Sequence, residues 1–149
     1  MRTIALSLLL LLSGGPARAA DADTPYTRIA KLASFISDGE PVGALEAFDK
    51  SMKQYGAIAE NLQALAAQND VLCSIDVVAD KEADNDFSDV HHLDLDWYMM
   101  LKSRADSSLV ERRRQRVAVT IQLFKGKSGG VWRITALSPD TILAPVTIK

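Results

Sequence analysis

Apolar and polar residues alternate strictly from Leu93 to Leu101, where every second side chain is apolar. Such alternation predicts a strand that is buried on one face and exposed on the other. A period of two also occurs over Val71–Ala79 and Val117–Leu123, and again over Trp132–Ala136, where the apolar residues move to even positions. The second half of the chain therefore predicts four strands.

The first half of the chain has a helical period instead. Thr24–Ser37 predicts a helix, with Thr24 as its N-cap and Pro25 at its first position. Pro41 opens a second predicted helix, and the period restarts after Gly56 and runs to Gln68. The apolar stripe of the second helix consists of Val42, Leu45, Phe48 and Met52. Helices followed by antiparallel strands predict an α+β fold with the helices on one face of a curved sheet.

The positions of the apolar residues restrict how the strands pair. The Leu93 and Val117 strands both carry apolar residues at odd numbers. These residues share one face only if the numbers of any two paired residues add up to an even value. A turn near Ser107 or Ser108 then places Tyr98 opposite Arg116 or Ala118. The last hairpin needs an odd sum, which predicts two pairs: Leu123 with Trp132, and Ile121 with Ile134. Both hairpins agree on one inner face.

Residues 1–20 predict a secretory signal peptide, and residues 21–149 a single domain. Arg2 precedes an apolar run from Ile4 to Leu12, and the small residues around Ala19 fit a cleavage site. No later apolar run approaches the roughly 20 residues of a membrane-spanning helix, so we expect no membrane contact after cleavage. Cleavage removes two arginines and changes the net charge from −2 to −4. The expected location is the periplasm or the medium, with the single Cys73 buried in a strand.

Five stretches resemble the nuclear transport factor 2-like superfamily, in particular its exported bacterial members close to the SnoaL-like group. They are Phe35–Gly39, Gly43–Asp49, Leu93–Trp97, Glu111–Val117 and Trp132–Thr135. The resemblance extends from about Pro25 to Pro145 and implies a cone-like fold in which helices and a curved sheet enclose a pocket. The family includes isomerases, dehydratases, cyclases and binding proteins without activity, so only the site decides between them.

The residues expected to line this pocket are mainly apolar: Phe48, Leu93, Leu95, Trp97, Met99, Val119, Ile121 and Trp132. Acid–base catalysis needs a titratable group at the reacting atoms. Asp94 and Asp96 belong to the opposite sheet face, which leaves Asp49, Tyr55 and His91 as the candidates if the protein is an enzyme. We therefore expect a non-catalytic module that binds an apolar or amphipathic small molecule. The alternative is an isomerase or dehydratase that uses a pocket acid.

Residues 80–89 form an acidic segment that predicts an exposed connection, and we tested it for a calcium loop. Counted from Asp80, the sixth position is Asn85 and the twelfth is His91, so the turn glycine and the terminal glutamate are both missing. The adjacent His91 and His92 point to opposite faces of a strand and have no Cys or third His to complete a zinc set. The sequence thus predicts no metal site and no cofactor.

Arginines from Arg112 to Arg116 lie on a strand, and those with even numbers share the outer sheet face with Asp96. This arrangement predicts a cross-strand ladder of stacked and paired side chains. The resemblance suggests a homodimer through the same face, with the interface residues Tyr98, Met100, Arg114 and Arg116. Nucleic acid is the least favoured partner, because the basic run is short and lies beside the acidic connection.

Overall fold

The computed structural model describes residues 23–147, so the predicted signal peptide lies outside the described residues. The elements in chain order are α1 (Pro25–Ser37), α2 (Pro41–Leu45), α3 (Tyr55–Gln68), β1 (Asn69–Asp80), β2 (Val90–Ser103), β3 (Leu109–Gly126), β4 (Gly129–Ser138) and the 3-10 turn η1 (Thr141–Leu143). Among these helices, none is long and apolar enough to cross a membrane.

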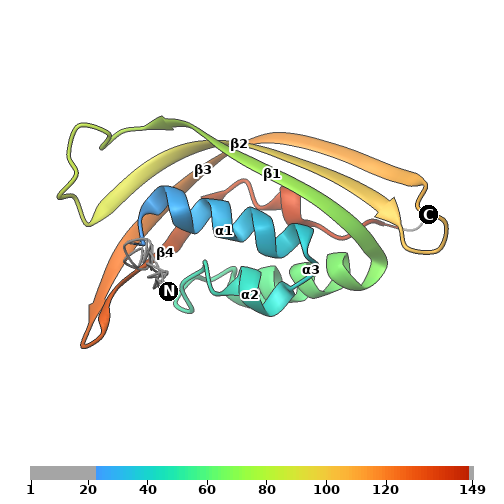
Figure 1. Cartoon of the computed structure of the whole chain (residues 1–149), viewed down its shortest axis with the longest axis horizontal. Helices are drawn as coiled ribbons and strands as arrows, with labels where there is room; N and C mark the ends of the chain where they lie inside the picture. Colours follow the sequence, from blue (N-terminus) through green and yellow to red (C-terminus); the bar gives the residue numbers. More distant parts are fainter. Residues whose placement is uncertain (1–22, 148–149) are drawn as a thin grey trace, which may run out of the picture.

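The four strands form one antiparallel sheet in the order β1-β2-β3-β4. Figure 1 shows this sheet arching over the three helices, which all lie on its concave side. The predicted α+β fold is therefore confirmed. The convex face of the sheet carries no helix in the described part of the chain.

Helix α1 begins as its sequence predicts. The Thr24 hydroxyl accepts a hydrogen bond from the backbone N–H of Thr27 at 3.1 Å, and the Thr27 hydroxyl accepts one from the backbone N–H of Thr24 at 2.8 Å. This reciprocal capping satisfies two donors at the helix start, and Pro25 occupies the first position, where no N–H is needed. The helix is followed by Gly39, whose φ of 68° suits the reversal into α2.

The second helix is much shorter than predicted and ends at Leu45. The chain then pairs with β4 instead of continuing the helix: the Asp49 N–H donates to the Ile134 carbonyl at 2.9 Å, and the Ile134 N–H donates to the Ala47 carbonyl at 2.7 Å. These bonds use backbone groups that a longer helix would need for itself. Val42, expected on the buried stripe, is 71% exposed.

The predicted inner face of the sheet is confirmed. Trp97 has no exposed surface, and it belongs to one hydrophobic core with the inward residues of β3 and β4 and with the apolar sides of α1 and α3. The core residues from these neighbours include Ile29, Leu32, Leu65, Val119, Ile121, Trp132 and Ile134. The apolar segment after β4 packs on the same core, because Ile142 and Leu143 are both buried.

The register between β2 and β3 differs from both predicted registers, by two residues from the nearer one and by four from the other. Tyr98 lies opposite Arg114, not opposite Arg116 or Ala118, and Met100 lies opposite Arg112. The numbers of paired residues do add up to an even value, so each side chain lies on the predicted face of the sheet. The predicted position of the turn was wrong, because the apolar pattern determines the face of each residue but not the length of the loop. In the next hairpin the predicted pair of Leu123 with Trp132 is confirmed.

Two bulges change which side chains face inward. Between Val77 and Ala79 the register of β1 shifts, so Asp80 lies opposite the buried Leu93 and on the inner face. A second shift lies between Thr120 and Ile121 in the pairing of β3 with β4. It buries Leu137 and exposes Ala136, so the prediction that Ala136 continues the inner face was wrong.

Candidate functional site

The residues predicted to line an interior pocket are packed into the core. They are Phe48, Leu93, Leu95, Trp97, Met99, Val119, Ile121 and Trp132, and all of them are buried. Of these eight, Phe48 also lines an open hollow at the surface of the molecule. The helices lie directly on the inner face of the sheet, so much of the expected cavity is occupied by side chains.

The hollow at Phe48, called the α2–β4 hollow below, has a volume of about 660 Å³. Its lining consists of Arg28 from α1, Val42, Leu45 and Glu46 at α2, Phe48, Asp49 and Lys50 in the following turn, Tyr55 from α3, and Val131 and Arg133 from β4. Apolar walls and several charged groups thus meet in one place. Two of the three candidate catalytic residues, Asp49 and Tyr55, lie in this lining.

Asp49 has a local structural role in the turn. One of its carboxylate oxygens accepts hydrogen bonds from the N–H of Ser51, at 3.2 Å, and from the Ser51 hydroxyl. The other oxygen lies 4.0 Å from a terminal nitrogen of Arg133. In this geometry the Asp49 carboxylate caps the turn at Ser51.

Two arginines bring positive charge to the α2–β4 hollow. A terminal nitrogen of Arg28 donates to Asp23 at 3.1 Å, whereas its buried Nε has no hydrogen-bond partner among residues 23–147. Asp23 also accepts a hydrogen bond from the backbone N–H of Trp132 at 2.9 Å, which fixes α1 to β4. The Arg133 guanidinium lies 5.5 Å from the ring centroid of Phe124. Arg28 is thus held in place by Asp23, and its Nε is buried without a partner among the described residues.

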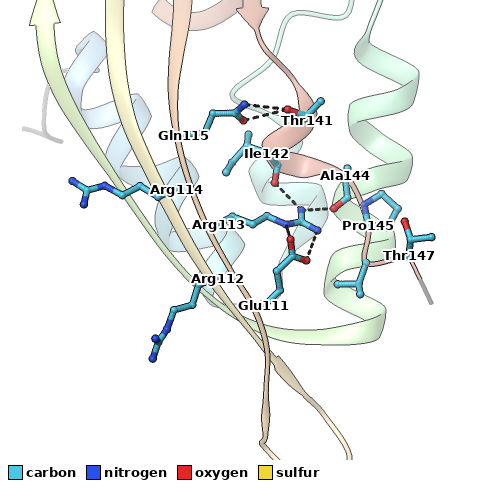
Figure 2. Close-up of a pocket in the computed structure, with 11 residues that line it drawn as sticks. Glu111, Arg112, Arg113, Arg114, Gln115, Thr141, Ile142, Ala144, Pro145 and Thr147 are labelled. Carbon is cyan, nitrogen blue, oxygen red and sulfur yellow. Dashed lines mark hydrogen bonds and ion pairs between the residues drawn. The ribbon is translucent and has the colours of Figure 1, made fainter. Parts of the chain in front are cut away.

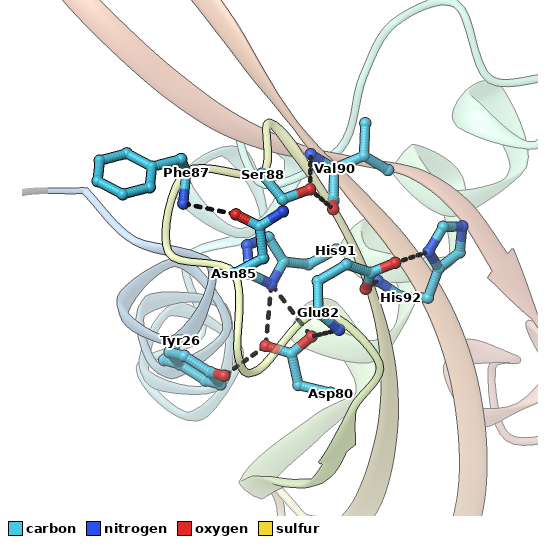
Figure 3. Close-up of polar contacts among 9 residues, drawn as sticks. All are labelled: Tyr26, Asp80, Glu82, Asn85, Phe87, Ser88, Val90, His91 and His92. Atoms are coloured by element: carbon cyan, nitrogen blue, oxygen red, sulfur yellow. Dashed lines mark hydrogen bonds and ion pairs between the residues drawn. The ribbon is translucent and has the colours of Figure 1, made fainter.

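His91, the third candidate, lies elsewhere, in a network with Asp80 and Tyr26. Figure 3 shows the three side chains pointing toward one another. The His91 Nδ1 atom lies 2.9 Å from an Asp80 carboxylate oxygen, and the Tyr26 hydroxyl donates to the same oxygen. The side chains of His91 and Asp80 are only 8% and 4% exposed. The His91 ring meets Trp132 edge to face, with 5.4 Å between centroids.

The network keeps Asp80 ionised and Tyr26 protonated. Burial raises the pKa of Asp80, but hydrogen bonds from Tyr26, His91 and the Glu82 backbone N–H outweigh this effect and hold the pKa below its ordinary value. The hydrogen bond to Asp80, together with burial, raises the pKa of Tyr26 to about 12. An ionised Asp80 can accept a hydrogen bond from an Nδ1–H of His91, which orients the imidazole ring.

The structure therefore separates the candidates: Asp49 and Tyr55 line the α2–β4 hollow, and His91 joins Asp80 at the ends of β1 and β2. Sequence reasoning missed Asp80 and placed it in an exposed connection. The bulge after Val77 is the reason, because it moves an even-numbered residue to the inner face. The available signal was the adjacent pair Val77 and Val78, which breaks the alternation.

The connection after β1 adds a further polar group to this region. Both oxygens of Glu82 contact His92: one accepts from its backbone N–H at 2.7 Å, and the other lies 2.6 Å from its Nδ1. Ligand-type atoms of Asp80, Glu82 and His91 all lie within 4.8 Å of one another. The sequence predicted no such set, because it assigned residues 80–89 to a fully solvated loop.

A hollow of about 610 Å³ lies between β3 and the C-terminal segment. Figure 2 shows Arg113 reaching across it, while Arg112 and Arg114 point the opposite way. Arg113 donates to the carbonyls of Ile142, at 2.9 Å, and Ala144, and it pairs with both oxygens of Glu111 at 3.1 Å. Arg113 thus fixes the C-terminal segment to the sheet, a role that the sequence did not indicate.

The outer sheet face carries one of the predicted cross-strand ion pairs, and the described residues show no arginine stacked on Tyr98. Arg114 pairs with Asp96 at 2.7 Å, and this hydrogen bond holds the pKa of Asp96 below its ordinary value. Arg116 lies directly opposite Asp96, and Tyr98 and Met100 are partly exposed on the same face. Leu72, opposite Met100, adds an apolar side chain that is 56% exposed.

No protein-family model matches the sequence, and the curated proteins searched gave no match. Among solved structures, the fold is similar to an NTF2-like superfamily protein from Salmonella enterica, with a TM-score of 0.53 and 14% identity over 83% of this chain and 89% of that one. It is also similar to a sec-c motif containing protein from Psychrobacter arcticus, with a TM-score of 0.53 and 15% identity over 86% of this chain. This chain matches 64% of the Psychrobacter protein's length. At these identities the likeness shows the fold alone: an α+β domain of NTF2-like architecture.

Proposed function

We propose that the protein is an exported, non-catalytic module that binds an amphipathic small molecule in the α2–β4 hollow. The observation that carries the proposal is the combination of apolar walls and charged groups in one hollow of about 660 Å³, where the cations Arg28, Lys50 and Arg133 outnumber the carboxylates Glu46 and Asp49. Small-molecule sites usually measure about 300–1,000 Å³ and combine apolar lining with a few polar groups. Export is supported by the signal-like composition of residues 1–20.

The charges indicate which end of a ligand binds where. Val42, Leu45 and Val131 offer apolar contacts for a hydrocarbon part. The guanidinium groups of Arg28 and Arg133, which both line the hollow, favour a carboxylate or another anionic head group. The preferred ligand is therefore an amphipathic anion, for which a medium-chain fatty acid is a suitable probe.

A binding titration with sodium laurate tests this proposal. We expect saturable binding, measured by calorimetry, that weakens about tenfold or more in Arg133→Gln, since hydrogen bonds to charged groups contribute about 1.5–3 kcal/mol. Lys127→Gln removes the same charge at the exposed turn between β3 and β4 and should bind laurate normally. Equal affinity in both variants, or no binding at all, would overturn the proposal.

The second candidate is an isomerase or dehydratase, and the buried pair of Asp80 and His91 favours it. An oriented imidazole beside an ionised carboxylate is a recurring general base for abstracting a proton next to a carbonyl. Incubation with cyclic enolisable ketones in D₂O, followed by mass spectrometry, detects such chemistry as deuterium uptake. Uptake that depends on His91 would favour this candidate over the non-catalytic one.

We also propose that the protein forms a homodimer through its outer sheet face. Opposite charges alternate there, as in the pair of Asp96 and Arg114, so two copies can offer complementary groups to each other. The partly exposed Tyr98 and Met100 and the exposed Leu72 supply residue types that are common in interfaces.

A further inference from the structure

We infer that Asp80, Glu82 and His91 form a binding site for a divalent transition-metal ion of the zinc class. The three residues come from different segments: Asp80 ends β1, Glu82 lies in the following connection, and His91 lies near the start of β2. Their ligand atoms lie within 4.8 Å of one another, and Asp80 and His91 approach to 2.9 Å. The inference is independent of the α2–β4 hollow, because these residues do not line it.

The donor set selects the kind of ion. Imidazole nitrogen and carboxylate oxygen are both normal zinc ligands, at about 2.0–2.2 Å, and two such atoms 2.9 Å apart can bind one ion at roughly a right angle. The ion would replace the hydrogen bond between them, so that Nδ1 binds the metal through its lone pair and the ring proton lies on Nε2. A nitrogen ligand disfavours calcium and magnesium, which prefer oxygen alone. Two carboxylates with a neutral imidazole also balance the double charge of the ion.

The surroundings of Asp80 and His91 resemble the supporting shell of metal sites. The Tyr26 hydroxyl and the Glu82 backbone N–H both donate to Asp80 and fix its orientation. The edge-to-face contact with Trp132 orients the His91 ring. Because the ligand atoms of Asp80 and His91 are already 2.9 Å apart and both side chains are more than nine-tenths buried, little side-chain motion is needed to bring these two ligands to one ion.

Glu82 is the adjustable ligand. It now contacts His92, and its side chain is 23% exposed while that of His92 is 50% exposed. An exposed contact of this kind contributes little to the free energy of folding, so replacing it with a bond to the metal costs little free energy. The remaining coordination positions would be filled by water from the open side of the connection.

Calorimetric titration of the EDTA-treated full chain with ZnCl₂, and with MgCl₂ for comparison, tests the inference. We expect one zinc ion per chain, much weaker magnesium binding, and a loss of zinc affinity of at least tenfold in Glu82→Gln. Asp84→Asn removes the same charge from an exposed position of the same connection and should bind zinc normally. His91→Asn should abolish binding.

Glu82 lies at the surface, so Glu82→Gln can be compared with the unmodified protein at equal folding, checked by circular dichroism. No zinc binding, or the same loss of affinity in Asp84→Asn as in Glu82→Gln, would overturn the inference. The first result would mean that the hydrogen-bonded network only anchors the connection after β1. The second would mean that the acidic residues attract cations without forming a specific site. Neither result would affect laurate binding, which is measured separately.

Discussion

Asp80 lies opposite Leu93 on the inner face of the sheet, although the inner-face residues before it in β1 have odd numbers. The bulge after Val77 brings the Asp80 carboxylate within 2.9 Å of His91 Nδ1. Asp80, which the sequence placed in an exposed loop, is therefore a buried anion. This single irregularity creates both the network with Tyr26 and the cluster with Glu82.

The first prediction concerns the pH dependence of stability. The pKa of Asp80 is lower in the folded protein than its ordinary value of about 3.9, so its contribution is present above that value and is lost as the pH falls through the folded pKa. Urea unfolding should show a weaker loss of stability below about pH 4 in Asp80→Asn than in the unmodified protein. Asp84→Asn serves as the control, and identical slopes in both variants would contradict the prediction.

The second prediction concerns Trp97, which is completely buried at the centre of β2. Trp97→Ala should lower the free energy of unfolding by roughly 3–5 kcal/mol, the range for removing a large buried aromatic side chain. Val42→Ala, at a position that is 71% exposed, should change it by less than about 0.5 kcal/mol. Chemical denaturation measures both, and similar losses in the two variants would refute the assigned core.

The third prediction compares two helical glycines. A Cβ atom at Gly43 would lie 2.5 Å from the Phe35 ring, whereas one at Gly56 would meet nothing within 4 Å. Gly43→Ala should therefore destabilise the protein by about 1–3 kcal/mol, the usual effect of overpacking. Gly56→Ala should stabilise it by about 0.4–1 kcal/mol, because alanine restricts the unfolded chain. Thermal unfolding of the two variants decides whether α1 and α2 pack as described.

The apolar pattern was enough to predict which face of each strand is buried, because Trp97, Val119 and Ile134 obey a simple period of two. It could not locate features that depend on single extra residues or on distant backbone partners. The bulges that redirect Asp80 and Leu137 are examples of the first kind. The early end of α2 is an example of the second, since its cause is the pairing of Asp49 with Ile134 on β4.

The candidate site was harder to predict than the fold for the same reason. Asp49 and Tyr55 do line one hollow, but Arg28 and Arg133, two of the three cations in its lining, lie far apart in the sequence. The position of His91 on β2 was predicted, whereas the inward position of its partner Asp80 was not, because it depends on the bulge after Val77.

The fourth prediction concerns assembly. Sedimentation at micromolar concentration should detect a dimer that Arg116→Glu weakens, because the substitution adds a negative charge beside Asp76, Asp94 and Asp96 on the outer sheet face. Lys127→Glu, at the exposed turn between β3 and β4, should leave the dimer intact. A monomer at all concentrations would contradict the proposed interface.

The most direct test of the binding function is native mass spectrometry of the protein purified from its own host. We predict a protein peak with an added mass that is released on denaturation and proves to be an amphipathic anion, and we expect this mass to be absent from Arg133→Gln. Two results would contradict binding in the α2–β4 hollow. One is that the unmodified protein and Arg133→Gln carry the same bound molecule, and the other is that the unmodified protein carries no organic ligand.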